Sequence, residues 1–175
     1  MKNQVTPKNN EVRLGADEFI VSKTNLKGVI TYTNRVFMQI AGYSESELIG
    51  VQHNIVRHPD MPRGVFKFLW QTLQQEQEFF GYVKNMCKDG SYYWVFANVT
   101  PDYDDRGNLT GYYSVRRQPS QKAINTLAPI YAEMLAVEKG AGARDAADRS
   151  IALLQEKLEA LGLSYFELVM SLDQE

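Results

Sequence analysis

The sequence is poor in the residues that build covalent crosslinks and metal centres. Its 175 residues include one cysteine, Cys87, and two histidines, His53 and His58. A single cysteine excludes an internal disulfide and a zinc site made of several cysteines. The two histidines are five residues apart, with no cysteine or third histidine beside them, which disfavours a zinc site at this pair.

Long apolar runs and a strong net charge are also missing. The apolar runs are far shorter than the roughly 20 residues of a membrane helix, and the polar start MKNQVTPKNN lacks the apolar segment of a signal peptide. The formal net charge of −2 gives no electrostatic reason to expect binding to nucleic acid or to an anionic membrane. We therefore expect a soluble, cytoplasmic protein without a membrane span.

Local patterns predict two strands, several short helices and then three more strands. Asn34 can cap a short helix that Gly42 ends, Ser44 and Glu47 have the spacing of a capping box, and Pro62 can begin a longer helix. β-Branched and aromatic runs, separated by turn residues, predict strands at 19–22, 28–32, 79–87, 92–101 and 109–117. This order predicts an α+β fold, with a five-stranded antiparallel sheet that carries short helices on one face.

The composition changes after Pro119, where helical patterns replace strands. Ser120 can cap a helix in which Pro129 predicts a kink or a boundary, and residues 140–143 form a break or hinge. Ile151, Leu154, Leu158 and Leu161 recur at helical spacing, but they span too few heptads for a coiled coil, which favours packing against the sheet domain. We thus predict an N-terminal cap at 1–18, a sheet domain at 19–119 and a C-terminal helical extension at 120–175.

Several motifs occur in a fixed order between residues 19 and 117, and HNIVRHPDMP is the most specific of them. With them, the chain resembles the PAS family of sensor domains, and within it the flavin-binding PAS domain of bacterial aerotaxis receptors. The resemblance implies the PAS fold and non-covalent binding of FAD. The matching motifs are GVITYTN, GYSESELIG, HNIVRHPDMP, FLWQTL, GYVKN, KDGSYYWVFANVTP and GNLTGYYSVR.

The resemblance implies that Asn34, Asn85 and Asn98 line the pocket, where amide groups can both donate to and accept from the imide edge of a flavin. The alternative is that these asparagines satisfy local backbone groups or cap helices. Arg57 and His58 are expected to bind the pyrophosphate, because charge-assisted hydrogen bonds to phosphate are strong.

Asp60 can orient Arg57 or His58, or hold a ribose hydroxyl; alternatively it pairs with Arg57 to shape a surface turn. Trp70, Phe66 and Phe79 are candidates for the aromatic wall of the pocket, although core packing is the alternative for both phenylalanines. Phe79 stands where the family commonly has tryptophan. His53 is assigned a structural role.

The predicted function is a sensor that binds FAD and signals a redox or oxygen-linked state through its flanking helices, either to a partner protein or to a second copy in a homodimer. The alternatives are a haem-binding gas sensor on the same fold and a ligand-free interaction or dimerisation module. No glycine-rich phosphate loop, nucleophile elbow or pair of catalytic carboxylates points to an enzyme. Cys87 does not stand where light-sensing relatives place their reactive cysteine.

Overall fold

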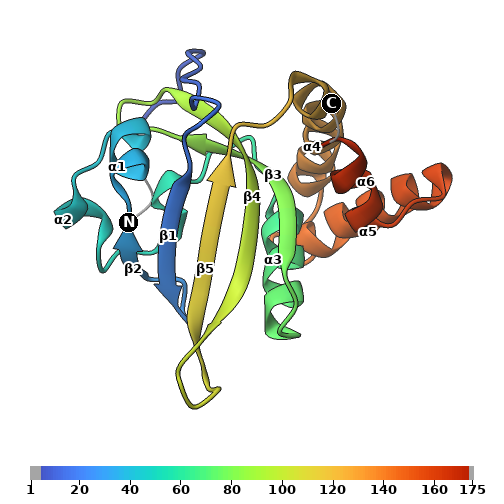
Figure 1. Ribbon diagram of the computed structural model, residues 1–175. Coiled ribbons are helices and arrows are strands. Elements are labelled where there is room, and N and C mark those ends of the chain that lie inside the picture. The colour runs from blue at the N-terminus through green and yellow to red at the C-terminus, as the bar shows by residue number, and fades with distance from the viewer. Residues whose placement is uncertain (1–4, 174–175) are drawn as a thin grey trace.

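The computed structural model describes residues 5–173, and its centre is one antiparallel sheet (Figure 1). The strand order is β2-β1-β5-β4-β3, so that β2 and β3 form the two edges. This arrangement confirms the predicted five-stranded sheet, with β4 two residues longer than predicted. The strands are β1 (Ile20–Asn25), β2 (Ile30–Thr33), β3 (Phe79–Met86), β4 (Tyr92–Tyr103) and β5 (Leu109–Arg117).

Four short helical elements pack on one face of the sheet, namely α1 (Arg35–Ala41), α2 (Glu45–Leu48), the 3₁₀ helix η1 (His53–Val56) and α3 (Arg63–Gln74). Asn34 caps α1, since its Oδ1 accepts a hydrogen bond from the Phe37 N–H, and the capping box at Ser44 and Glu47 is present. Pro62 occupies the N-cap position of α3, one residue before the helix, rather than its first turn. The local start and stop signals therefore placed these helices to within one residue.

The segment before β1 lies along the β3–β4 hairpin. The Lys8 N–H donates to the Gly90 carbonyl (2.8 Å), and the Val12 N–H donates to the Tyr92 carbonyl (2.7 Å). The first four residues of the predicted cap and the last two of the predicted extension, 1–4 and 174–175, lie outside the described residues. The described part of the cap is thus held by backbone hydrogen bonds to a hairpin about 80 residues further along the chain.

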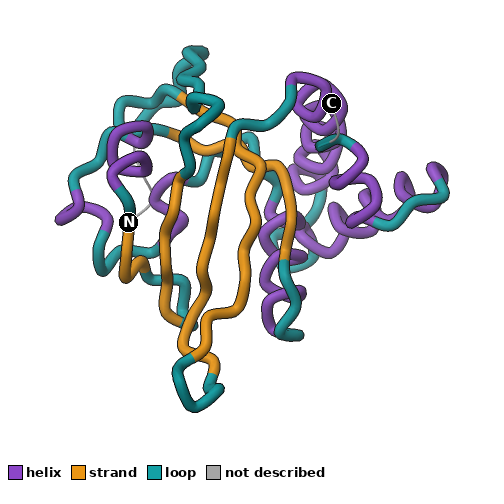
Figure 2. The backbone as a smooth tube through the Cα atoms, viewed as in Figure 1, coloured by secondary structure: helices purple, strands orange, loops and turns teal. Residues whose placement is uncertain are grey.

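The C-terminal helices α4 (Gln121–Gly140), α5 (Ala146–Leu161) and α6 (Tyr165–Ser171) gather at the β3 edge (Figures 1 and 2). On one face of the sheet, Tyr131 of α4 stacks with Trp94 and donates its hydroxyl to the Tyr82 carbonyl (2.8 Å). On the other face, Tyr165 of α6 contacts Phe79. An uncovered edge strand would be a template for unwanted strand pairing. Helix α5, which carries the repeated apolar residues, packs on α3 of the sheet domain and on α4 rather than on the sheet itself. Packing against the sheet domain, rather than a coiled coil, is confirmed.

Helix α4 runs through Pro129 without interruption, so of the predicted kink or boundary at this proline the boundary is wrong. Proline removes one helical hydrogen bond, but Leu127, Tyr131 and Met134 on the same helix are buried and anchor both sides of it. The chain does leave the helix after Gly140, in the predicted break, before α5 begins at Ala146. Packing here outweighs the local preference of one residue.

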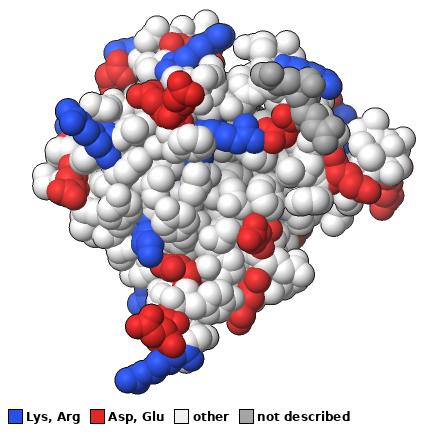
Figure 3. Space-filling model, in the orientation of Figure 1, with Lys and Arg blue, Asp and Glu red and all other residues white. Residues whose placement is uncertain are grey.

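The surface over the exposed face of the sheet carries few charged side chains at its centre, and acidic and basic groups are interspersed around it (Figure 3). Val21 and Val115, which face this side, are only half-buried. Among residues 5–173, no helix combines the length and apolar character that crossing a bilayer requires.

The Tyr131 hydroxyl predicts a measurable anchor for the helical extension. Tyr131→Phe leaves the buried Tyr82 carbonyl without its donor, so the free energy of unfolding should fall by about 1–3 kcal/mol. Tyr103→Phe is the matched control, because the Tyr103 hydroxyl binds Glu76 at the surface and its loss should cost about 0.5 kcal/mol or less. Equilibrium urea unfolding measures both; equal losses would contradict the anchoring role.

Candidate functional site

Residues 52–57, called the strap below, cross the helical face of the sheet and are tied to both of its edge strands. At one end Gln52 forms a β-bridge with Val29, beside β2, and the His53 N–H donates to the Gly28 carbonyl (2.9 Å). At the other end Arg57 forms a β-bridge with Asn85 of β3. Because β2 and β3 are opposite edges, the strap spans the sheet and leaves a space beneath it.

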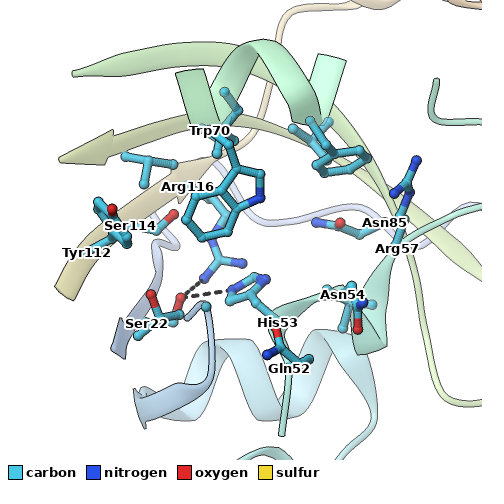
Figure 4. A pocket seen from close by; sticks show the side chains of 18 of the residues that line it. Ser22, Gln52, His53, Asn54, Arg57, Trp70, Asn85, Tyr112, Ser114 and Arg116 are labelled. Carbon is cyan, nitrogen blue, oxygen red and sulfur yellow. Dashed lines mark hydrogen bonds between the residues drawn. The ribbon is translucent and has the colours of Figure 1, made fainter. Parts of the chain in front are cut away.

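This space is a cavity of about 240 Å³ between the strap, α3 and the sheet (Figure 4). Helix α3 contributes its apolar side chains at the spacing of one helical face, and β3 and β4 contribute small and β-branched residues from alternate positions. The Trp70 ring packs against Gly28, where an added Cβ would come within 3.1 Å of the indole. The apolar lining consists of Val56, Phe66, Leu69, Trp70, Leu73, Val83, Ala97 and Val99.

One side of the cavity contains a buried arginine with free donors. Arg116 of β5 is 3% exposed, and its Nη2 donates to Ser22 Oγ, which lies 3.1 Å from His53 Nε2 (Figure 4). Its Nε and Nη1 have no hydrogen-bond partner within the described part of the chain. Arg116 thus lines the cavity while two nitrogens of its guanidinium lack an acceptor.

Burial determines the protonation states of Arg116 and His53. Burial lowers the pKa of Arg116 to about 10, so its guanidinium remains charged at neutral pH. Burial, together with the neighbouring Arg116 charge, lowers the pKa of His53 to about 3, so this ring is neutral. A buried cation without a hydrogen-bonded counter-group is costly. The site thus suits a ligand that presents acceptor atoms to Arg116.

A second group of polar side chains lines the cavity near the β3 end of the strap. Figure 4 places Arg57 and Asn85 on the opposite side of Trp70 from Ser22. The Arg57 guanidinium lies over the Phe66 ring, 4.2 Å from its centroid, and Asn85 is 5% exposed. Polar groups on two sides and an aromatic wall between them are the features that position a flat molecule with hydrogen-bonding edges.

Four of the nine predicted site residues line the cavity, namely Arg57, Phe66, Trp70 and Asn85. Their contact with a cofactor stays a prediction. The other five, Asn34, His58, Asp60, Phe79 and Asn98, are placed elsewhere by local packing and strand geometry, as follows.

Asn34 and Asn98 do not share the cavity with Asn85. The Asn34 side chain is hydrogen-bonded to backbone groups. Its Oδ1 accepts from the Phe37 and Val21 N–H groups, and its Nδ2 donates to the Phe19 carbonyl. Asn98 stands between Ala97 and Val99, which line the cavity, and side chains alternate along a strand. It therefore faces the opposite side of the sheet, where its Nδ2 lies 3.4 Å from Glu78 Oε2.

His58 and Asp60 hold the loop after the strap. His58 is 2% exposed, and its Nδ1 accepts from the Asp60 N–H (3.1 Å). Asp60 Oδ2 pairs with Lys84 Nζ of β3 (2.7 Å), so its salt-bridge partner is this lysine and not Arg57, the partner in the alternative given for it. Burial and the nearby Lys84 charge lower the pKa of His58 to about 4, which keeps it neutral.

Phe79 has the core-packing role that was the alternative for it. It is 1% exposed and lies against Phe68 of α3 and Tyr165 of α6. A ring of the C-terminal extension thus contacts the position where the family commonly has tryptophan.

Several lining residues were not among the predicted ones. His53 lines the cavity although it was assigned a structural role, and β5 contributes Tyr112, Ser114 and Arg116. Because side chains alternate along a strand, the predicted strand would have put these three residues on one face. The sequence alone would not have shown that this face lines the cavity. Cys87 lies outside the lining and donates its thiol to the Ile40 carbonyl. Residues 5–173 contain no group of three His, Cys, Asp or Glu side chains placed to hold a metal ion.

Comparison with known proteins gives the family. Residues 30–116 match the family described as PAS fold. The chain is 41% identical over 118 residues to the aerotaxis receptor of Escherichia coli (strain K12), covering 67% of this chain and 23% of that receptor. It is 32% identical over 100 residues to the nitrogen fixation regulatory protein of Klebsiella pneumoniae, covering 57% of this chain and 20% of that protein.

Among solved structures, the light state of the blue-light photoreceptor Aureochrome1 LOV has a TM-score of 0.53 at 20% identity, covering 72% of this chain and 93% of that one, which supports the fold. The chain spans less than a quarter of the two full-length relatives. Their names denote a receptor and a regulator. The sheet, the helical face and these matches agree, and the chain is a PAS-domain protein.

Proposed function

We propose that the cavity binds the ring system of FAD non-covalently, and that the protein signals a redox or oxygen-linked state through its C-terminal helices. The observation that carries this proposal is Arg116, a buried cation that lines a cavity with an aromatic wall and has two guanidinium nitrogens without a hydrogen-bond acceptor. The sequence resemblance to the flavin-binding PAS domains of aerotaxis receptors supplies the identity of the ligand.

The lining residues fit a flavin. Its imide edge presents two carbonyl oxygens, which can accept from the free donors of Arg116, and the Asn85 amide can both donate and accept. Phe66 and Trp70 offer aromatic surface to a planar ring. At about 240 Å³ the cavity is just below the ~300–1,000 Å³ of small-molecule pockets, so it suits the ring rather than a whole dinucleotide. Arg57 is the cation available to the phosphates.

A bound flavin supplies electron transfer coupled to proton uptake. The residues of this chain set the conditions around it. Arg116 holds a positive charge at the polar side of the cavity, neutral His53 shares Ser22 with that arginine, and the Asn85 amide can reverse its donor and acceptor atoms by turning. A change in the charge of the ligand would therefore meet groups able to reorient.

The signal would leave through the helices that follow β5. Helices α4 and α6 pack on β3, and α5 packs on α3, so two walls of the cavity touch the extension directly. The outer face of the sheet, which carries few charged side chains at its centre (Figure 3), offers further surface for a partner protein or a second copy. Helices linked to a site by such contacts can shift or lose order when the state of the bound ligand changes.

One observation favours the haem alternative, namely that His53 lines the cavity. Against it, His53 Nε2 is engaged with Ser22 and the ring lies beside the Arg116 cation. A ligand-free module would leave Arg116 buried without an acceptor for its two donors, which is costly. FAD satisfies these donors and uses the aromatic wall.

The purified protein is expected to show the absorption bands of an oxidised flavin, either as isolated or after incubation with FAD. Heat denaturation should release the chromophore, because the binding is non-covalent. A Soret band would establish haem in its place, and an absence of both sets of bands after incubation with FAD and with haem would support the ligand-free module. Absorption spectroscopy before and after ultrafiltration makes this measurement.

Arg116→Met should weaken FAD binding by about 10- to 100-fold, because hydrogen bonds to a charged group contribute roughly 1.5–3 kcal/mol. Since it also removes an unpaired buried charge, the free energy of unfolding of the ligand-free protein should stay equal or rise. Arg117→Met, one residue further, is the control: Arg117 pairs with Asp173 of the extension, and FAD affinity should hardly change. Equal FAD affinity of both variants, by fluorescence titration, would overturn the role of Arg116.

The two asparagines of β3 and β4 give an independent test. Asn85→Ala removes a buried amide of the lining, and FAD affinity should fall by about tenfold for one or two lost hydrogen bonds. Asn98→Ala alters the opposite face of the sheet and should leave affinity within about twofold. A larger loss in Asn98→Ala than in Asn85→Ala would show that the ligand lies on the other side of the sheet.

A further inference from the structure

Helix α3, which carries the aromatic wall of the cavity, does not cap its own N-terminus. Pro62 occupies the N-cap position and makes no side-chain capping bond, and the first turn contains no acidic residue. The first N–H groups of a helix have no partner within it and need an acceptor from elsewhere. The position of this helix therefore depends on another part of the chain.

Glu138, in the last turns of α4, supplies the acceptor. Its Oε1 accepts a hydrogen bond from the Gly64 N–H at 3.0 Å, across 74 residues of sequence. A carboxylate at this place is also favoured by the partial positive charge of the helix N-terminus. Residue 138 lies outside the part of the chain that matches the PAS fold.

Helix α5 holds this carboxylate in place. Ser150 is fully buried, and its hydroxyl donates to the same Glu138 oxygen at 2.7 Å. A Cβ at Gly64 would stand 2.2 Å from Ser150 Oγ, so α3 and α5 reach this distance only because residue 64 has no side chain. Gly64, Glu138 and Ser150 are called the capping junction below.

The capping junction lies next to the cavity. Gly64 lies two residues before Phe66. The Phe66 side chain lines the cavity, and its ring lies under the guanidinium of Arg57. The pKa of Arg57 is lowered by burial and raised in turn by the Glu138 carboxylate. One carboxylate of the extension thus acts on the wall helix by a hydrogen bond and on a strap cation by its charge.

We propose that Glu138 is a positioning residue for the cavity, and that docking of α4 and α5 at the capping junction and binding of a cavity ligand favour each other. The docked extension fixes the first turn of α3 and with it the Phe66 wall. Coupling of this kind is reciprocal, so the ligand strengthens docking by the factor by which docking strengthens ligand binding. The identity of the ligand rests on the proposed function, whereas the positioning of α3 does not.

The test compares Glu138→Ala and Glu138→Gln with Glu133→Ala. Glu133 is also on α4, but it pairs with Lys157 of α5 (2.7 Å) rather than with α3. Hydrogen exchange at residues 63–67 should accelerate in Glu138→Ala, with FAD binding weakened about tenfold, within the 5- to 150-fold range of such couplings. Glu138→Gln keeps an acceptor, so its exchange rate at residues 63–67 and its FAD affinity should lie between those of Glu138→Ala and the wild type. Glu133→Ala should match the wild type in both measurements.

The reciprocal measurement separates coupling from a general loss of stability. FAD should slow hydrogen exchange in residues 146–161 of the wild type and of Glu133→Ala, but not of Glu138→Ala. Unchanged exchange at residues 63–67 in Glu138→Ala, or wild-type FAD affinity despite faster exchange there, would overturn the inference. If the wild type binds no FAD, the proposed function fails, and exchange at residues 63–67, which needs no ligand, then decides the positioning role alone.

Discussion

The attachment of the strap to both edge strands is the constraint on which the cavity depends. Bridges at Gln52 and Arg57 hold the ends of residues 52–57 at β2 and β3, and the backbone between them forms the 3₁₀ helix η1. Since main-chain hydrogen bonds fix both ends, the middle of the strap cannot settle onto the sheet. His53 and Val56 form the roof, and α3 closes the side that the strap leaves open.

Within this enclosure, one unpaired cation determines what the site can accept. Arg116 has a donor bond to Ser22 and a stacking contact with Phe37, 4.6 Å from its guanidinium carbon to the ring centroid, but no carboxylate among its described partners. Two of its guanidinium nitrogens lack an acceptor, while neutral His53 adds no competing charge. The fold thus holds a desolvated positive group in place before a ligand binds. Such preorganisation favours binding, because the site needs little rearrangement when the ligand arrives.

Local signals in the sequence were enough for the strands, the hairpins and the helix starts, because capping and turn chemistry involve residues a few positions apart. The site depended on long-range geometry. Asn85 and Asn98 look equivalent in their motifs, but the alternation of β4 turns Asn98 away from the cavity. Asp60 lies near Arg57 in sequence and yet pairs with Lys84, 24 residues on. Arg116 could be assigned to the site only by knowing which face of the sheet packs against α3.

The distance in sequence between Gly64 and Glu138 has a consequence for biosynthesis. A chain grows from its N-terminus, so all five strands and α3 are synthesised before Glu138 and Ser150. Until Glu138 is made, the Gly64 N–H therefore lacks the acceptor that it has in the complete protein. The first turn of α3, where the cavity wall begins, can gain this hydrogen bond only after most of α4 has been synthesised.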